Sequence, residues 1–186
     1  MEAYQVERKL AAIFSADVKG YSRLMGEDEV ATIRTLTAYR EVMSTFIRQY
    51  RGRVLDSPGD NLLAEFASVV DAVQCAVETQ RELTARNADL PPERKMEFCI
   101  GINLGDVIVE KERSYGDGVN LAARLEGLAE AGGICISGIV YDQVETKFYA
   151  SRFTPLASDQ RLAHPHHLPV ALHAKRVLAP AHGVAA

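Results

Sequence analysis

Two aspartates stand at places where the chain is predicted to change direction. Asp17 ends the apolar run KLAAIFSADV (9–18), which predicts a strand, and Asp60 lies in the turn PGDN of a predicted β-hairpin, VLDSPGDNLLAEF (54–66). In a split βαβ sheet the first strand commonly lies beside the strand that feeds the hairpin, so the two carboxylates can converge. Hard cations such as Mg²⁺ and Mn²⁺ prefer such oxygen ligands. The alternative is a helix cap at Asp17 and ordinary turn chemistry at Asp60.

The residues that follow Asp17 form a second candidate site. Lys19, Gly20, Tyr21 and Ser22 predict a glycine-opened turn into the N-terminus of a helix. Free backbone N–H groups at such an end suit phosphate oxygens. A phosphate cradle beside a pair of metal-binding acids is the layout of nucleotide chemistry. The alternative is an ordinary strand-to-helix loop.

A third candidate site lies on a helix predicted over residues 118–130. Its apolar stripe is made of leucines (Leu121, Leu125 and Leu128). Asn120 and Arg124 are four residues apart, so they share a different face. An amide beside a guanidinium can orient a ribose and stabilise charge on a transferring phosphate. The alternative is a solvated helix face.

The elements that position the first two sites follow from the spacing of apolar residues. After the strand at 9–18, helical spacing predicts one long helix over about 28–50. The hairpin comes next, and the capping-box-like run from Ser68 to Asp71 starts a second helix.

The second half of the chain continues with two strands and a helix. After Pro91-Pro92, the runs MEFCIGINL and DVIVE predict two strands joined at Gly105. Asp117 is available as the N-cap of the helix at 118–130. A short strand at 134–137, a short helix at 139–146 and a last strand within PVALHAKRV complete the pattern.

This order of elements predicts an α+β protein. We expect a ferredoxin-like split βαβ core, a mostly antiparallel sheet with helices packed on one face. The predicted domain covers 1–178, and 179–186 are expected to form a disordered tail.

Composition excludes several classes of function. The chain has 186 residues, enough for one domain with a real core, and a net charge of −4. That charge gives no reason to expect a nucleic acid or an anionic membrane as partner. No apolar run is long enough for membrane insertion. Three widely spaced cysteines (Cys75, Cys99 and Cys135) predict core thiols in a reducing compartment, so we expect a cytoplasmic protein.

Four motifs, taken in order and spacing, closely resemble the class III nucleotidyl cyclase catalytic domain. They are FSADVKGYSRL, SPGDNLLAEF, YGDGVNLAARLE and GGICISG, and the resemblance covers about 9–148. It implies a head-to-tail homodimer with composite active sites. It also implies an enzyme that converts ATP to 3′,5′-cyclic AMP and pyrophosphate, through in-line attack of the ribose 3′-oxygen on the α-phosphorus.

The resemblance gives each candidate residue a role. Asp17 and Asp60 would bind two Mg²⁺ or Mn²⁺ ions, with help from the backbone carbonyl of Val18, and the turn 19–22 would hold the terminal phosphates. One ion would lower the pKa of the attacking hydroxyl while the other neutralises the phosphates.

The helix residues would act in the neighbouring site. Asn120 would orient the ribose, and Arg124 would stabilise the charge that develops on the α-phosphate. Both side chains would come from the partner subunit.

The base-recognition positions depart from the family. The usual adenylyl version has a lysine four residues before the hairpin aspartate and an aspartate seven before the helix asparagine. Here these positions hold Asp56 and Arg113, so the charges are reversed. The donors and acceptors of this pair can match adenine or guanine equally well, or the two side chains can pair with each other. The resemblance alone favours ATP.

The C-terminal region departs as well. No lysine lies between Lys147 and the predicted last strand, where the family usually places a phosphate-binding lysine. Arg161 and Lys175 are the available substitutes. His164, His166 and His167 match no common zinc spacing, which favours an exposed loop.

Three functions follow from these observations. The leading hypothesis is an active homodimeric adenylate cyclase, because Asp17, Asp60, Asn120 and Arg124 occur together. One alternative is a catalytically silent nucleotide-binding or dimerisation module, which the reversed charges of Asp56 and Arg113 would suit. The other alternative is a guanylate cyclase.

Overall fold

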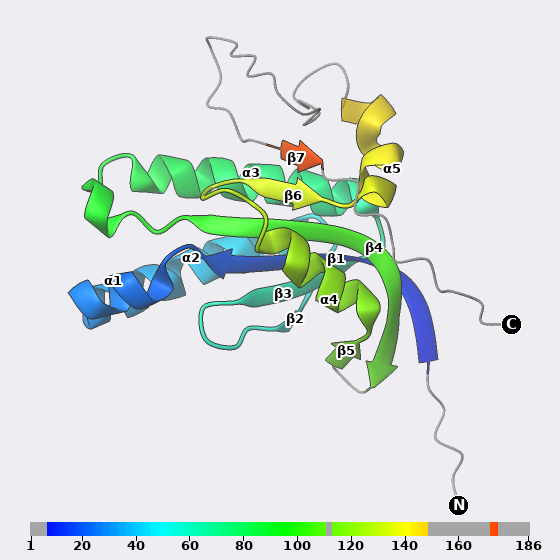
Figure 1. The fold of residues 1–186 in the computed structure, drawn as a ribbon, viewed down its shortest axis with the longest axis horizontal. Coiled ribbons are helices and arrows are strands. Elements are labelled where there is room, and N and C mark those ends of the chain that lie inside the picture. The colour runs from blue at the N-terminus through cyan, green and yellow to red at the C-terminus, as the bar shows by residue number, and fades with distance from the viewer. Residues whose placement is uncertain (1–6, 111–112, 149–171, 175–186) are drawn as a thin grey trace, which may run out of the picture.

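The computed structural model describes residues 7–110, 113–148 and 172–174, which form one sheet with helices on it (Figure 1). The strands are β1 (Glu7–Val18), β2 (Arg53–Asp56), β3 (Leu62–Phe66), β4 (Phe98–Glu110), β5 (Arg113–Tyr115), β6 (Ile134–Ile136) and β7 (Leu172–Ala174). The helices are α1 (Tyr21–Glu27), α2 (Glu29–Gln49), α3 (Val69–Asn87), α4 (Asp117–Glu126) and α5 (Gly138–Phe148), with a 3₁₀ turn, η1, at Pro92–Arg94. No helix in these ranges is long and apolar enough to cross a bilayer.

The strand order confirms the predicted fold class. The sheet runs β2-β3-β1-β4-β6-β7, and β5 pairs with β4 beside this path. β1 is antiparallel to both β3 and β4, whereas β6 is parallel to β4 and β7 is parallel to β6. β1, α2, the β2–β3 hairpin, α3 and β4 therefore form the split βαβ core.

The predicted division of the fourth strand at Gly105 is wrong. β4 is continuous, and its pairing with β1 runs without a break from Val18 opposite Phe98 to Glu7 opposite Val109. Because β1 is long enough to supply a partner on both sides of Gly105, no turn is needed there. The glycine instead permits close packing, since an added Cβ would lie 3.1 Å from the Cα of Gly118 in α4.

Helices cover both faces of the sheet, so the expectation of a single covered face is also wrong. Phe14 and Ala16 of β1 belong to the larger core with α2, α3 and α5, whereas Ala11 and Ile13 pack with Ala122 of α4. Figure 1 shows α4 crossing the side of the sheet opposite to α2 and α3. Since β1 is apolar on both faces, each face requires a cover.

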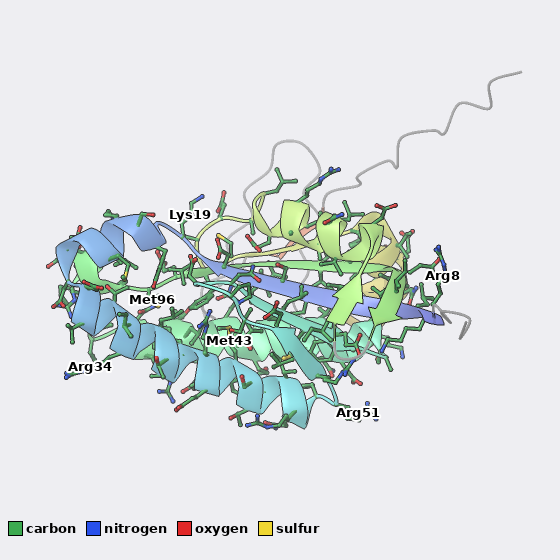
Figure 2. All side chains as sticks on the ribbon, turned by 90° about the horizontal axis from the view of Figure 1, so that it is seen from below. Arg8, Lys19, Arg34, Met43, Arg51 and Met96 are labelled. Atoms are coloured by element: carbon green, nitrogen blue, oxygen red, sulfur yellow. The ribbon has the colours of Figure 1, made fainter. Side chains whose placement is uncertain are left out.

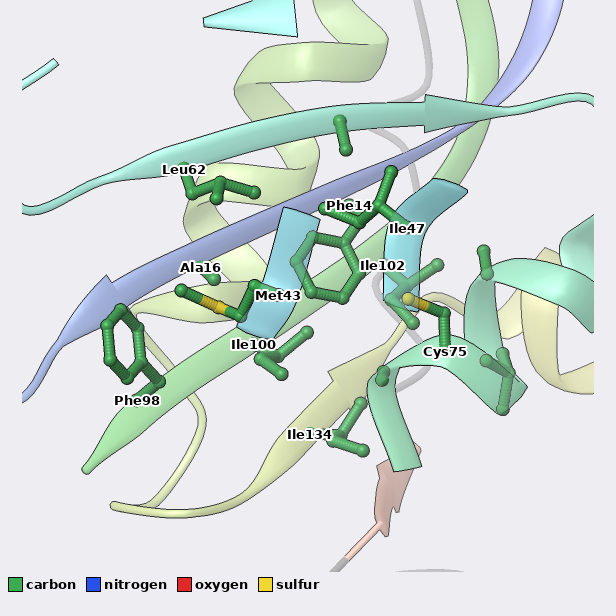
Figure 3. Close-up of a cluster of buried hydrophobic side chains, with 14 of the residues drawn as sticks. Phe14, Ala16, Met43, Ile47, Leu62, Cys75, Phe98, Ile100, Ile102 and Ile134 are labelled. Atoms are coloured by element: carbon green, nitrogen blue, oxygen red, sulfur yellow. The ribbon is translucent and has the colours of Figure 1, made fainter. Parts of the chain in front are cut away.

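The larger core fixes α2 against the sheet. Figure 3 shows Met43 and Ile47 of α2 in one cluster with Phe14 and Ile100 of the sheet, and all four side chains are fully buried. The three cysteines are buried and free, as predicted, with Cys75 in this core and the other two beneath α4. Burying large apolar side chains stabilises the fold by about 1.5–3 kcal/mol each.

The helix ends agree with the sequence at two places and differ at a third. Asp28 caps α2 by accepting from the N–H of Ala31 at 3.0 Å, and Ser68 caps α3. In contrast, α4 is preceded by Gly116, and Asp117 lies in its first turn without capping it. The helix ends at Glu126, so Leu128 lies outside it and is 48% exposed.

α4 lies against β4 at Gly101 without any intervening side chain. A Cβ at this position would collide with the carbonyl oxygen of Ala122 and the N–H of Glu126. We expect Gly101→Ala to lower the free energy of unfolding by about 1–3 kcal/mol, because the backbone of a packed helix cannot move aside easily. Chemical denaturation measures this loss.

Gly26→Ala is the matched control, because a Cβ at Gly26 in α1 would meet nothing within 4 Å. It should cause no loss of stability. Equal denaturation midpoints for the two variants would contradict the close docking of α4.

Candidate active site

The structure brings Asp17 and Asp60 together. Ala16 pairs with Leu62, so the end of β1 lies beside the turn that leads into β3. Asp17 follows Ala16, and Asp60 precedes Leu62 by two residues. Burial, the negative charge of Asp60 and a hydrogen bond with its side chain together raise the pKa of Asp17 to about 6, against a weaker opposing hydrogen bond from the N–H of Val18. Like charges held this close favour the protonated form.

This acid pair fits a divalent cation. Two carboxylates that repel each other gain from a shared positive charge. Mg²⁺ is usually bound by one or two carboxylates together with substrate phosphates and water. Among the described residues there is no group of three or more His, Cys, Asp or Glu side chains arranged to hold a metal. A pair completed by substrate oxygens therefore matches the chemistry of Mg²⁺ or Mn²⁺ better than that of a structural zinc site.

An arginine on α2 holds the turn that carries Asp60. The Nη2 atom of Arg40 donates to the carbonyl oxygens of Ser57 (3.2 Å), Asn61 (2.9 Å) and Gly59. Gly59 has a positive φ of 56°, which glycine adopts without strain, and the N–H of Asn61 closes the turn on the carbonyl of Pro58 at 3.0 Å. Arg40 therefore fixes the shape of the loop that presents Asp60. The sequence offered no signal for this role, because an arginine on a helix is normally a solvated side chain.

The turn after β1 leaves backbone donors available. Gly20 adopts the left-handed conformation (φ 70°) and starts α1, and its carbonyl accepts from the N–H groups of Arg23 and Leu24. The N–H groups of Tyr21 and Ser22 make no hydrogen bond to any described residue. Lys19 is exposed at the same turn (Figure 2). An anion placed here would meet two free N–H groups and one ammonium group.

Among the described residues, Asn120 and Arg124 form no hydrogen bond or ion pair with Asp17 or Asp60 of their own chain. Both lie on the exposed side of α4. Within the described part of the chain, the guanidinium of Arg124 forms no ion pair or hydrogen bond. An unpaired arginine beside an unpaired amide, on the outer face of a well-packed helix, is available to a ligand or to another subunit.

The two base-recognition candidates lie on strands that approach each other, β2 and β5. Asp56 is exposed at the end of β2, and its carboxylate accepts from the N–H of Ser57 at 2.8 Å. Arg113 begins β5, and its side chain is outside what the structure describes. Arg161, the histidines at 164, 166 and 167, and Lys175 also lie outside the described residues.

A third acid, Glu126, lies next to the pair and was not predicted. Burial and the negative charges of Asp17 and Asp60 raise the pKa of Glu126 to about 7, against the opposing effect of hydrogen bonds from Ser15 and Asn61. A charged residue on the buried face of α4, beside Ala122 and Leu125, is the signal that could have revealed it.

Comparison with known proteins defines the family. The model of the adenylate and guanylate cyclase catalytic domain matches residues 3–157. The chain therefore belongs to the adenylate and guanylate cyclase catalytic domain family.

One curated relative carries a cyclase name. A protein of Rhizobium meliloti (strain 1021) named "Putative adenylate cyclase 3" is 45% identical over 145 residues, which are 77% of this chain and 25% of that protein. The chain thus spans about a quarter of that relative's length.

Solved structures agree on the fold. The adenylate/guanylate cyclase/hydrolase from Silicibacter pomeroyi is 39% identical, with a TM-score of 0.75 over 82% of this chain and 89% of that one. The adenylyl cyclase CyaB from P. aeruginosa is 25% identical, with a TM-score of 0.66 over 76% and 83%.

The acid pair predicts a pH-dependent metal response. We expect saturating Mn²⁺ to raise the melting temperature at about pH 7.5, with a gain of about 2.7 kcal/mol at a hundredfold excess over Kd. The gain should shrink at about pH 5, because a proton on Asp17, with its pKa raised to about 6, competes with the ion. Differential scanning fluorimetry measures both values.

The controls separate the site from the surface. Asp17→Asn and Asp60→Asn should lose the metal response, whereas Asp142→Asn, at an exposed acid on α5, should keep it. An Mn²⁺ response of equal size in all three variants would show that the ion binds elsewhere.

Proposed function

We propose that this domain is an adenylate cyclase that converts ATP to 3′,5′-cyclic AMP and pyrophosphate. The observation that carries the proposal is that Asp17 and Asp60 lie close together, next to the turn with the free N–H groups of Tyr21 and Ser22. A site of two acids next to an anion cradle suits a triphosphate with its metal ions. The cyclase family and the name of the 45% identical relative support this reaction class.

The residues of one chain would bind the metal–triphosphate part of the substrate. Asp17 and Asp60, with the carbonyl of Val18, would hold two Mg²⁺ or Mn²⁺ ions, which lower the pKa of the 3′-hydroxyl and neutralise phosphate charge when bound. Lys19, Gly20, Tyr21 and Ser22 would hold the β- and γ-phosphates. Arg40 keeps the Asp60 loop in shape while the triphosphate enters.

The partner subunit would complete the site. Asn120 would orient the ribose so that its 3′-oxygen lies in line with the α-phosphorus and the leaving pyrophosphate. Arg124 would stabilise the charge on the α-phosphate as the new O3′–P bond forms and the bond to the bridging oxygen breaks. The exposed, unpaired state of both side chains supports a role across an interface.

The choice of ATP over GTP depends on Asp56 and Arg113. Asp56 can accept from the exocyclic amine of adenine while Arg113 donates to N1. With guanine, Arg113 can donate to O6 while Asp56 accepts from N1–H. The name of the Rhizobium relative favours ATP. Three buried free thiols favour the cytoplasm as the compartment.

A silent nucleotide-binding module is the second candidate. Its supporting observation is the reversed base-recognition pair, because a protein that no longer turns over a purine substrate has no need to read the base. Product formation separates the two candidates: cyclic AMP from the parent and none from Asp60→Ala supports the enzyme, and no cyclic product from either protein supports the module.

Mixed dimers test the composite site. Asp60→Ala and Arg124→Ala should each abolish cyclic AMP formation when purified alone. An equal mixture should recover about a quarter of the parental activity, because half of the dimers are mixed and each of these has one intact site of two.

The mixing experiment has its own control. Asp60→Ala mixed with Asp17→Ala should stay inactive, since both variants damage the same half of the site. Recovery in that control, or no recovery in the test mixture, would contradict a head-to-tail arrangement.

Base reading is tested by kinetics with both triphosphates. We expect Asp56→Ala to change the ratio of kcat/KM for ATP over GTP by about tenfold or more, because a bidentate base contact discriminates by about 1–3 kcal/mol. Arg113→Ala should change the same ratio. Asp89→Ala, at an exposed acid after α3, is the control and should leave it unaltered. Unchanged ratios in the first two variants would mean that they do not read the base.

A further inference from the structure

Glu126 is a buried acid with specific partners on two other elements. It is 9% exposed, on the side of α4 that faces the sheet. Its Oε2 atom accepts from Ser15 Oγ at 2.8 Å and from Asn61 Nδ2 at 3.3 Å. Asn61 Nδ2 also donates to Ser15 Oγ at 3.4 Å. These hydrogen bonds link β1, the turn before β3 and α4.

Ser15 and Asn61 are close in sequence to the two aspartates of the acid pair. Ser15 precedes Asp17 by two residues on β1, so their side chains lie on the same face of the strand. Asn61 directly follows Asp60, and Arg40 holds its carbonyl at 2.9 Å. The carboxylate of Glu126 therefore accepts hydrogen bonds from a residue close in sequence to each aspartate, Ser15 near Asp17 and Asn61 next to Asp60.

The backbone of Glu126 is held in place by the packing of α4 against β4. Ser15 pairs with Gly101, and the absence of a side chain at Gly101 lets the N–H of Glu126 approach β4 directly. Glu126 therefore starts from a backbone position that cannot drift relative to β1. A short hydrogen bond from such a position transmits that rigidity to Ser15.

We propose that Glu126 is a positioning residue, which holds Asp17 and Asp60 at the spacing and orientation that a divalent ion requires. This inference rests on the metal role proposed above for the two aspartates. Glu126 acts through Ser15 and Asn61, because its Oε2 atom accepts from both and its side chain is buried between α4 and the sheet. Residues that orient metal ligands by hydrogen bonds typically change metal affinity by about 10- to 100-fold.

Direct Mn²⁺ binding to the full chain, measured by calorimetry, tests the proposal without using activity. Glu126→Ala should weaken binding by about 10- to 100-fold, and Ser15→Ala should weaken it in the same direction. Glu126→Gln should stay within about threefold of the parent, because its amide oxygen can still accept from Ser15. Asp142→Asn is the control at an exposed acid and should bind as the parent does.

Two results would overturn the proposal. Parental Mn²⁺ affinity in Glu126→Ala would show that no positioning is needed. Equal weakening by Glu126→Gln and Glu126→Ala would show that the charge of Glu126 acts, and not its hydrogen bonds. If Glu126→Ala does not fold, as judged from its metal-free melting curve, Ser15→Ala and Glu126→Gln still decide between these outcomes.

Mixed dimers locate the effect within the site. When Asp60→Ala and Arg124→Ala chains are combined, the one intact site takes its acids from the Arg124→Ala chain. Glu126→Ala added to that chain should lower kcat and raise the Mn²⁺ requirement, whereas Glu126→Ala added to the other chain should do neither. Equal loss from either chain would indicate a general effect on folding and overturn the proposal.

This design separates the two levels of inference. A mixture without any Glu126 substitution that recovers no activity would contradict the composite active site of the proposed function. The calorimetric comparison would then still decide whether Glu126 positions the acid pair.

Discussion

The site depends on one constraint, the close approach of the half-buried carboxylates of Asp17 and Asp60. The register of β1 with β3 forces the two carboxylates together, and partial burial denies them the water that would screen their charges. The natural complement of two carboxylates held in this way is a positive ion. Functional sites commonly keep such local strain, which the rest of the fold compensates.

The surrounding structure limits how far the pair can relax. Arg40 fixes the turn from the α2 side of the sheet, and Glu126 reaches it from the α4 side. The two layers of helices are therefore not equivalent covers, because each supplies one polar side chain to the same loop. Packing of both layers is required before the Asp60 turn has a single shape.

The sequence predicts the parts of this site that depend on local pattern. Asp17 and Asp60 could be placed together because strand order in a split βαβ core determines which ends meet. Glu126 could not be linked to Ser15, since the two residues are 111 positions apart and only the docking of α4 joins them. The pattern also fails at Gly105, where a glycine that allows a helix to approach has the same appearance as one that makes a turn. The two-sided cover of β1 was missed because a continuous apolar run does not state how many faces are buried.

The distribution of the cysteines gives this domain an internal reporter of motion. Cys75 lies in the core between the sheet and α3, where burial raises the pKa of its thiol to about 12, while Cys99 and Cys135 lie under α4. A buried thiol is inert toward alkylating reagents until its surroundings open. The relative rates at which the two groups of thiols become alkylated would therefore tell which helical layer separates from the sheet first. Thiol alkylation can thus report the opening of each face of the sheet separately.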